Sequence, residues 1–144
     1  MPEVVLGFDY GTHKIGVASG QTLTQTATPL TTLRCRDGQP DWQQVAVLLQ
    51  TWQPDALVVG HPFEMTDREA NHAPAAKKFA RRLYGRFHLP VHLVDERLTT
   101  REAWSQLGTV AAKDPEKVDA QAARLILETW LDQDQAAVRL QPIH

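Results

Sequence analysis

Residues 4–12, VVLGFDYGT, decide the fold, because an apolar run ends there in a carboxylate and a turn. Residues 4–8 are typical of a strand that is buried on both faces, and Asp9 stands at its carboxyl end. An ionised group in that position needs a metal, a hydrogen-bond donor or water to offset its desolvation. Two interpretations of Asp9 stay open at this point, a functional carboxylate and a simple cap of a β-turn.

The rest of the chain predicts one α/β domain over residues 1–144, built on a five-stranded mixed sheet with helices on both faces. The first three strands are joined by short turns and should form an antiparallel meander. Strands are expected at residues 4–9, 14–19, 24–33, 55–60 and 91–94, and helices at 42–52, 74–87 and 117–134, with a short helix opened by a capping box at Thr99.

Composition excludes a strongly basic protein wrapped by nucleic acid, because the chain has 15 Lys and Arg and 17 Asp and Glu, which give a formal charge of −2. Any nucleic-acid contact must therefore be local. The chain has a single cysteine, and no run of residues suggests a signal peptide or a membrane span. We expect a cytoplasmic protein without a membrane partner.

That cysteine, Cys35, lies between Arg34 and Arg36, which could lower the pKa of its thiol. No His or Asn stands in a recognisable register with it. We interpret Cys35 as incidental to function.

Positive charge is concentrated on one expected helix, at residues 74–87, where apolar residues fill the opposite side at helical spacing. Its cations are Lys77, Lys78, Arg81, Arg82 and Arg86. The pattern fits a solvated surface better than a phosphate-binding face, although both interpretations stay open.

Asp119 joins Asp9 as a candidate functional carboxylate. It shares one stripe of the last helix with the apolar residues Ala123 and Ile126, so it should face the sheet. An exposed position would serve the helix dipole equally well, and the inward position favours function over capping.

The fifth strand runs into Asp95 and Glu96, and its exit should meet the other two carboxylates at the carboxyl edge of the sheet. Period-two alternation puts Asp95 and Glu96 on opposite sides, and we expect Glu96 to be the functional residue. Converging carboxylates repel unless a cation compensates. An oxygen-only set fits Mg²⁺ or Mn²⁺ better than zinc.

With these motifs in hand, the chain resembles the YqgF-type family of pre-16S ribosomal RNA nucleases, also described as Holliday-junction resolvases, which have a ribonuclease H-like fold. The resemblance covers nearly the whole chain. It rests on residues 7–12 (GFDYGT), 15–18 (IGVA), 58–62 (VVGHP), 95–100 (DERLTT), and Asp119 with Ala122 and Ala123.

The resemblance implies metal-binding catalytic roles for Asp9, Glu96 and Asp119 in phosphodiester hydrolysis. It implies structured RNA, the pre-16S precursor above all, as the substrate, with ribosomal particles as possible partners and branched DNA as the alternative. Two departures from the family pattern affect substrate contact: His13-Lys14 replaces a Lys-Arg pair, and residues 64–68 replace an Asn-Met-Asp-Gly loop.

Nucleic-acid contacts are expected from the turn after Asp9, from the residues that follow Glu96, and from a flap over residues 108–116 that precedes the last helix. The candidates are Gly11, Thr12, Lys14, Arg97, Thr99, Thr100 and Lys113.

Two other functions compete with a nuclease. A turn like the one after Asp9 is also typical of the first strand of actin-like phosphotransferases. That fold needs two such domains to close on a nucleotide, and 144 residues provide one. A noncatalytic nucleic-acid-binding module is the other, and the intact acidic set argues against it. RNA and DNA, internal and terminal cutting, and monomer and dimer all stay open.

Overall fold

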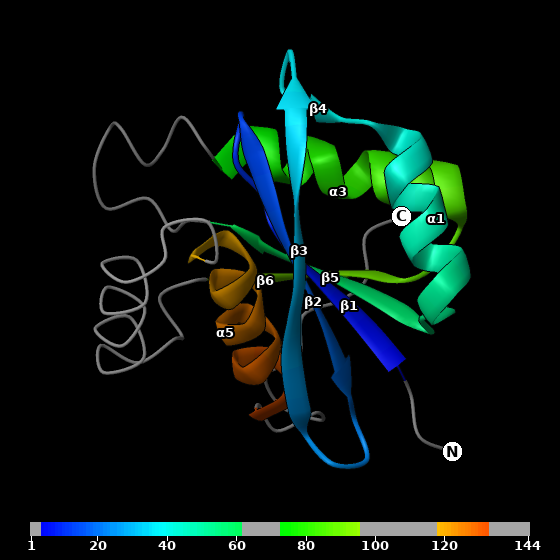
Figure 1. Ribbon diagram of the computed structural model, residues 1–144, viewed down its shortest axis with the longest axis vertical. Coiled ribbons are helices and arrows are strands. Elements are labelled where there is room, and N and C mark those ends of the chain that lie inside the picture. The colour runs from blue at the N-terminus through cyan, green and yellow to red at the C-terminus, as the bar shows by residue number, and fades with distance from the viewer. Residues whose placement is uncertain (1–3, 62–72, 96–117, 133–144) are drawn as a thin grey trace.

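The computed structural model describes residues 4–61, 73–95 and 118–132, and these residues form a mixed sheet with helices on both faces (Figure 1). The α/β class expected from the sequence is confirmed. The expected short helix at Thr99 and the flap over 108–116 lie outside the described residues. In chain order the elements are β1 (Val4–Asp9), β2 (Lys14–Gln21), β3 (Thr26–Arg36), β4 (Gln39–Pro40), α1 (Trp42–Trp52), β5 (Ala56–His61), α3 (Ala73–Phe87), β6 (Val91–Asp95) and α5 (Val118–Asp132).

The strands lie in the order β4-β3-β2-β1-β5-β6. β1, β2 and β3 form the expected antiparallel meander, and β5 and β6 run parallel to β1. β1 is therefore central, with an antiparallel neighbour on one side and a parallel neighbour on the other. Its residues 5, 6 and 8 are fully buried, as the apolar run predicts.

Within the described ranges the sheet has six strands, one more than expected, because β4 pairs with Cys35 and Arg36 at the edge of β3. Asp37 and Gly38 turn the chain between the two strands with φ of 54° and 77°. A two-residue hairpin loop requires this left-handed conformation. A strand of two residues carries no periodicity that a sequence pattern could detect, so its existence depends on pairing alone.

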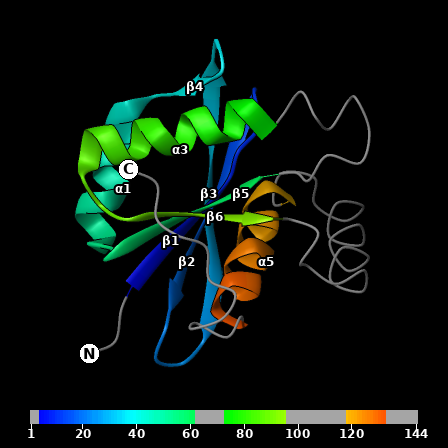
Figure 2. The same ribbon diagram turned by 180° about the vertical axis from the view of Figure 1, so that it is seen from behind.

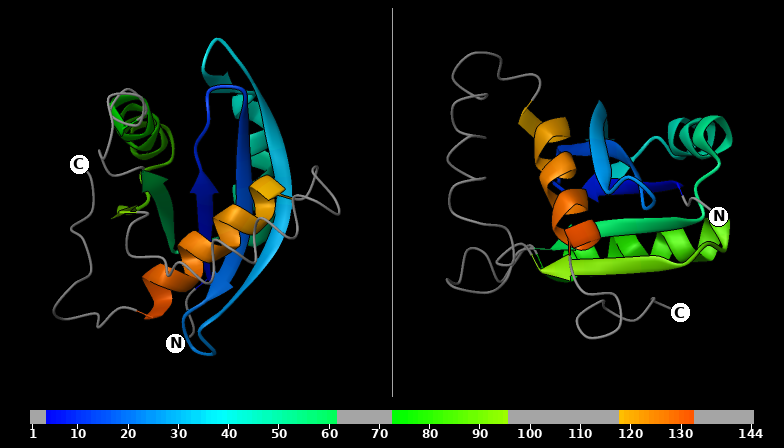
Figure 3. Two further views of the ribbon diagram at one scale, coloured as in Figure 1. Left: turned by 90° about the vertical axis from the view of Figure 1, so that its left-hand side faces the viewer. Right: turned by 90° about the horizontal axis from the view of Figure 1, so that it is seen from below.

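Side chains alternate along the strands, and the sheet separates two apolar clusters. α1 and α3 cover one face and α5 covers the other (Figures 1 and 3), with α3 in front of the strands when the molecule is seen from behind (Figure 2). The buried residues of the first cluster are Leu6, Phe8, Ile15, Val17, Leu33, Val45, Leu49, Leu57, Val59, Phe79, Ala80, Leu83 and Val91. Those of the second are Val5, Ala18, Ala56, Val58, Val94, Ala123, Ile126, Leu127, Trp130 and Leu131.

α5 packs unusually close to the sheet, because glycines lie beneath it. A Cβ atom on Gly7 would lie 2.4 Å from Cγ of Leu127, and one on Gly60 would lie 2.3 Å from Cδ1 of Ile126. Side chains at these two positions would displace the α5 side chains that pack against them. The stripe predicted from the sequence is confirmed, since Ala123, Ile126 and Trp130 are buried against the strands.

α1 begins and ends at recognisable caps. The carboxylate of Asp41 accepts a hydrogen bond from the backbone N–H of Gln43 (2.9 Å), as expected of an N-cap. Gln53 ends the helix in the left-handed conformation and donates its N–H to the carbonyl of Leu49. Trp52, which helical spacing assigns to the core, is instead 39% exposed.

None of the helices within the described residues has the length and apolar character that crossing a membrane requires.

Candidate active site

The parallel strands β1, β5 and β6 end at one edge of the sheet. Asp9 at the end of β1 is aligned with Gly60 in β5, and His61 at the end of β5 is aligned with Asp95 at the end of β6. The first turn of α5 lies on this side of the molecule, at the left in Figure 1 and at the right in Figure 2. Ligand sites of α/β proteins lie beyond the carboxyl ends of parallel strands.

Asp119 reaches this edge from the first turn of α5. A Cβ atom on Gly16 would lie 1.8 Å from the carbonyl oxygen of Asp119, so the backbones of helix and strand touch at this point. Gly16 is also the cross-strand partner of Asp9 in the β1–β2 ladder. Asp9 and Asp119, far apart in the sequence, therefore flank the same glycine, and both are half-buried.

Both aspartates belong to the α5 side of the sheet. Gly7 lies against Leu127 of α5, and the period of two along a strand brings Asp9, two residues further on, to that same face. The opposite face is occupied by Phe8, which packs edge-on against Phe79 of α3 with 5.7 Å between ring centroids. Asp9, at the end of its strand, and Asp119, in the inward position that the helical stripe predicts, thus lie on the same face of the sheet.

The turn after Asp9 is tight. A Cβ atom on Gly11 would lie 2.6 Å from the carbonyl oxygen of Lys14, so only glycine fits there without a shift of the backbone. Thr12 and Lys14 are exposed on this turn, together with His13. The turn thus leaves a hydroxyl and an ammonium group accessible beside Asp9.

Tyr10 fixes this turn to two other elements, a role that the sequence alone does not reveal. Its hydroxyl donates a hydrogen bond to the carbonyl of Gly38 in the β3–β4 hairpin (2.7 Å). Its ring packs against Phe79 of α3 at 5.2 Å between centroids. Burial raises the pKa of the Tyr10 phenol, the neighbouring Cys35 adds to the rise, and the charge of Arg82 opposes it.

Cys35 supports the same turn from β3. Its thiol donates to the carbonyl of Gly11, with 3.7 Å between sulfur and oxygen. Burial raises the pKa of this thiol, so the flanking arginines do not produce the lowered pKa considered from the sequence. A neutral thiol in that position packs against the turn and is a poor nucleophile.

Several expected site residues lie outside the described residues, and the structure does not describe their positions: Glu96, Arg97, Thr99, Thr100 and Lys113. Asp95 is the last described residue of β6. Within the described ranges, no three His, Cys, Asp or Glu side chains come together as a metal-binding group. The described part of the candidate site is the pair Asp9 and Asp119.

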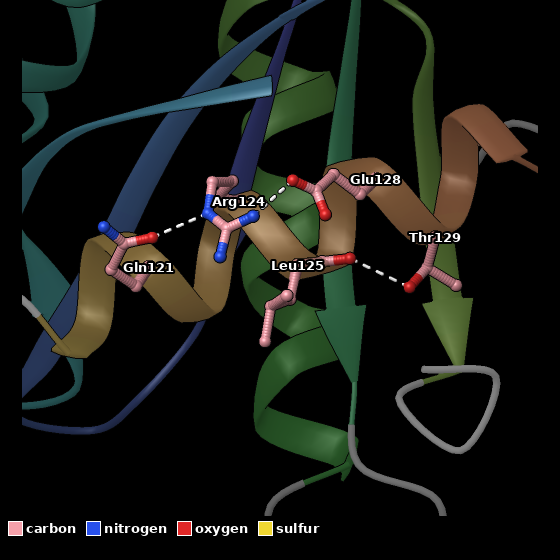
Figure 4. Close-up of polar contacts among 5 residues, drawn as sticks. All are labelled: Gln121, Arg124, Leu125, Glu128 and Thr129. Carbon is pink, nitrogen blue, oxygen red and sulfur yellow. Dashed lines mark hydrogen bonds and ion pairs between the residues drawn. The ribbon is translucent and has the colours of Figure 1, made fainter. Parts of the chain in front are cut away.

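Polar groups on α5 form a separate set along the helix (Figure 4). Arg124 donates to the side-chain oxygen of Gln121 (2.6 Å) and forms an ion pair with Glu128, and Thr129 donates to the carbonyl of Leu125 (2.8 Å). These contacts are three or four residues apart and stabilise the helix modestly. They bind Arg124 to its own helix instead of to the strand edge.

The fold is the ribonuclease H-like α/β fold, which the chain shares with solved junction resolvases. The solved structure of T. thermophilus RuvC in complex with a Holliday junction substrate matches with a TM-score of 0.62 and 17% identity, over 98% of this chain and 99% of that one. The Fowlpox virus resolvase, solved with Holliday junction DNA, matches with a TM-score of 0.54 and 12% identity, over 90% and 97%. At these identities the similarity establishes the fold.

Sequence relatives identify the family. A protein of Glaesserella parasuis named "Putative pre-16S rRNA nuclease" is 50% identical over 136 residues, which cover 92% of this chain and 99% of the relative. A Haemophilus ducreyi protein of the same name is 48% identical over 135 residues, covering 92% and 98%. The family model described as "RuvX: Holliday junction resolvase" matches residues 3–133. The chain belongs to this RuvX nuclease family.

Proposed function

We propose that this chain is a divalent-metal-dependent nuclease that hydrolyses phosphodiester bonds in structured RNA, with the precursor of 16S rRNA as its favoured substrate. One observation carries the proposal: Asp9 and Asp119 flank Gly16 at the carboxyl edge of the sheet. Relatives that share about half of the sequence and are named for pre-16S rRNA support the choice of substrate.

The two aspartates fit a hard cation. Two carboxylates brought to one edge repel each other unless a positive charge lies between them, and oxygen ligands favour Mg²⁺ or Mn²⁺ over zinc. Asp9 and Asp119 would hold the ion. When bound, such an ion activates a water molecule as the nucleophile and stabilises the oxygen that leaves.

Glu96 is the third carboxylate of the proposal, although it lies outside the described residues. Val94 packs in the α5 cluster, and a period of two in the sequence predicts that the residue two positions later belongs to the same side. For that reason we assign the role to Glu96 and not to Asp95.

The turn after Asp9 would receive the phosphate. Because Gly11 has no side chain, backbone N–H groups of the turn can approach a phosphate oxygen. The exposed hydroxyl of Thr12 can donate to the same group, and the ammonium of Lys14 supplies positive charge. Arg97, Thr99, Thr100 and Lys113 are proposed to extend these contacts along the strand.

A second candidate function is cleavage of four-way DNA junctions, favoured by the description of the family model. Resolution requires two coordinated cuts and thus a dimer that presents two sites. The formal net charge of −2 offers little support for a broad basic surface that would hold the four arms of a junction. We therefore rank RNA first and the junction second.

The test is cleavage of a pre-16S rRNA fragment by the purified chain with and without Mg²⁺ or Mn²⁺. Asp9→Asn, Asp119→Asn and Glu96→Gln should each lower the metal-dependent rate by about 100-fold or more, since even residues that only support a metal ligand cost 10- to 100-fold. Thermal unfolding of each variant establishes that the fold is intact.

Asp132→Asn is the matched control, because this exposed carboxylate lies at the other end of α5. It should cleave at the rate of the unmodified chain. Activity that survives in Asp9→Asn would remove the mechanism. Paired incisions of a synthetic four-way junction, with RNA left uncut under the same conditions, would reverse the order of the two substrates.

We place this activity in the cytoplasm, in association with ribosomal particles that carry the precursor. A chain with one cysteine and a half-buried neutral thiol suits a reducing compartment.

A further inference from the structure

α3 carries a basic face that the candidate site does not account for. Lys77, Lys78 and Arg81 are exposed on this helix, while Phe79 and Leu83 are buried against the sheet. The helix sequence APAAKKFARRLYGRF contains no Asp or Glu. In a chain with a formal charge of −2, this is a local excess of positive charge.

The amino end of α3 lies on the same side of the molecule as the candidate site. α3 follows β5, whose carboxyl end adjoins Asp9 through the pair Asp9 and Gly60. It ends at Phe87, and only three residues separate this end from the start of β6 at the opposite edge of the sheet. Figures 1 and 2 show the start of α3 on the side where β5 and β6 end and α5 begins.

Two of the five α3 cations, Arg82 and Arg86, are less available to a ligand than the other three. The guanidinium of Arg86 lies over the ring of Trp42, 4.4 Å from its centroid, an arrangement typical of a cation–π contact. Arg82 is half-buried on the same helix, whereas Lys77, Lys78 and Arg81 are exposed.

The other three cations have no acidic partner among the residues that the structure describes. In the part of the chain that the structure describes, no ion pair involves Lys77, Lys78 or Arg81. Lys77 and Arg81 are one helical turn apart, about 6 Å along the axis, and Lys78 and Arg81 are neighbours on the same surface. Three such charges in a row match a chain of repeating phosphates better than a single anion.

We infer that the basic face of α3, formed by Lys77, Lys78 and Arg81, binds the phosphate backbone of the nucleic-acid strand that is cut beside Asp9. The inference rests on the proposed nuclease function and adds the path of the substrate. The strand leaves the cleavage site over the α3 layer instead of over α5, where Arg124 is already paired with Glu128.

The salt dependence of binding tests this path directly. Affinity for a single-stranded RNA of about 30 nucleotides is measured without divalent ions, so that no cleavage occurs. Each phosphate contact contributes about 0.7 to the slope of log K against log salt concentration for a single strand. Lys77→Gln, Lys78→Gln and Arg81→Gln should each reduce the slope by about that amount, and the triple variant by about 2.

Cleavage kinetics provide a second readout. With a long RNA, the triple variant should raise KM at moderate salt and leave kcat unchanged, because the lost contacts are remote from the reacting phosphate. With an oligonucleotide too short to reach α3, it should behave as the unmodified chain does. Gln is a good helix former, so the exposed substitutions should leave the thermal midpoint in place.

Arg124→Gln is the matched control, an arginine on α5 that its own helix already holds. It should keep the unmodified salt slope. If the α3 triple variant also keeps that slope while RNA is still cleaved, the inference is overturned and the proposed function stands. If the unmodified chain neither binds nor cleaves nucleic acid, both are overturned.

Discussion

The backbone of Gly16 in β2 lies directly against the backbone of Asp119 in α5. Nothing but a hydrogen fits between them, and the atoms in the way belong to main chain that cannot rotate aside. Because Gly16 is also paired with Asp9, this contact sets how closely the two carboxylates approach each other.

Gly16→Ala should therefore damage activity more than stability. The added methyl must push the first turn of α5 outward, and overpacking of this kind costs about 1–3 kcal/mol of unfolding free energy. A displacement of about 1 Å at a catalytic group can cost about 100-fold in rate. Urea unfolding and cleavage rate, measured on the same preparation, separate the two effects.

Gly7→Ala is the control for that experiment. Its methyl would meet the side chain of Leu127 and not a backbone atom, so it should destabilise the protein while cleavage by the folded fraction is largely kept. Equal losses of rate in both variants would show that Gly16 has no special role in positioning Asp119.

Gly85→Ala should stabilise the protein. Gly85 lies inside α3, and a Cβ atom there would meet no other atom within 4 Å. Alanine in place of a helical glycine should raise the free energy of unfolding by about 0.5–1 kcal/mol. Chemical denaturation measures this free energy, and an unchanged or lower midpoint would contradict the open surface assigned to Gly85.

Much of the fold follows from local patterns. The apolar runs of β1 and β5 and the stripe of α5 are long enough for periodicity to identify, and the structure confirms them. β4 could not be predicted from the sequence, because two residues have no period. Its pairing depends on the left-handed conformation of Asp37 and Gly38. Trp52 fits the helical spacing of a core residue, yet it is the last residue of α1 and is 39% exposed.

The candidate site divides in the same way. Strand alternation and helix geometry give the direction of a side chain, which is why Asp9 and Asp119 could be selected from the sequence. They do not give the distance between two elements, so no sequence pattern could predict the contact of Gly16 with Asp119. The hydrogen bond from Tyr10 to Gly38 also joins segments whose proximity depends on the β3–β4 hairpin.

Tyr10→Phe should loosen the turn beside Asp9. The substitution keeps the ring against Phe79 and removes the half-buried hydrogen bond to the carbonyl of Gly38. Loss of such a bond costs about 1 kcal/mol of unfolding free energy, and amide exchange in the β3–β4 hairpin should become faster. Thr24→Val removes an exposed hydroxyl pair with Thr26 and should cost close to nothing. A hairpin with unchanged exchange would contradict the anchoring role.

The Cys35 thiol should make stability fall at alkaline pH. Burial raises the pKa of this thiol above its ordinary value of 9.0 in the folded chain, so above that pH the unfolded chain holds fewer protons than the folded one. Stability then decreases as pH rises, and it is constant below pH 9 as far as this group is concerned. Urea midpoints measured from pH 7.5 to 10.5 should decline less steeply in Cys35→Ala than in the unmodified chain.

Thiol reactivity examines the same property without unfolding the protein. Because only the thiolate reacts, Cys35 in the folded chain should react with a disulfide reagent at pH 8 more slowly than in the urea-unfolded chain. Tyr10 also has a raised pKa and its loss of stability starts above its ordinary value of 10.0, so the two groups separate by pH. Reaction of the folded thiol at the unfolded rate, together with parallel pH profiles for Cys35→Ala and the unmodified chain, would place Cys35 in open solvent and contradict its contact with Gly11.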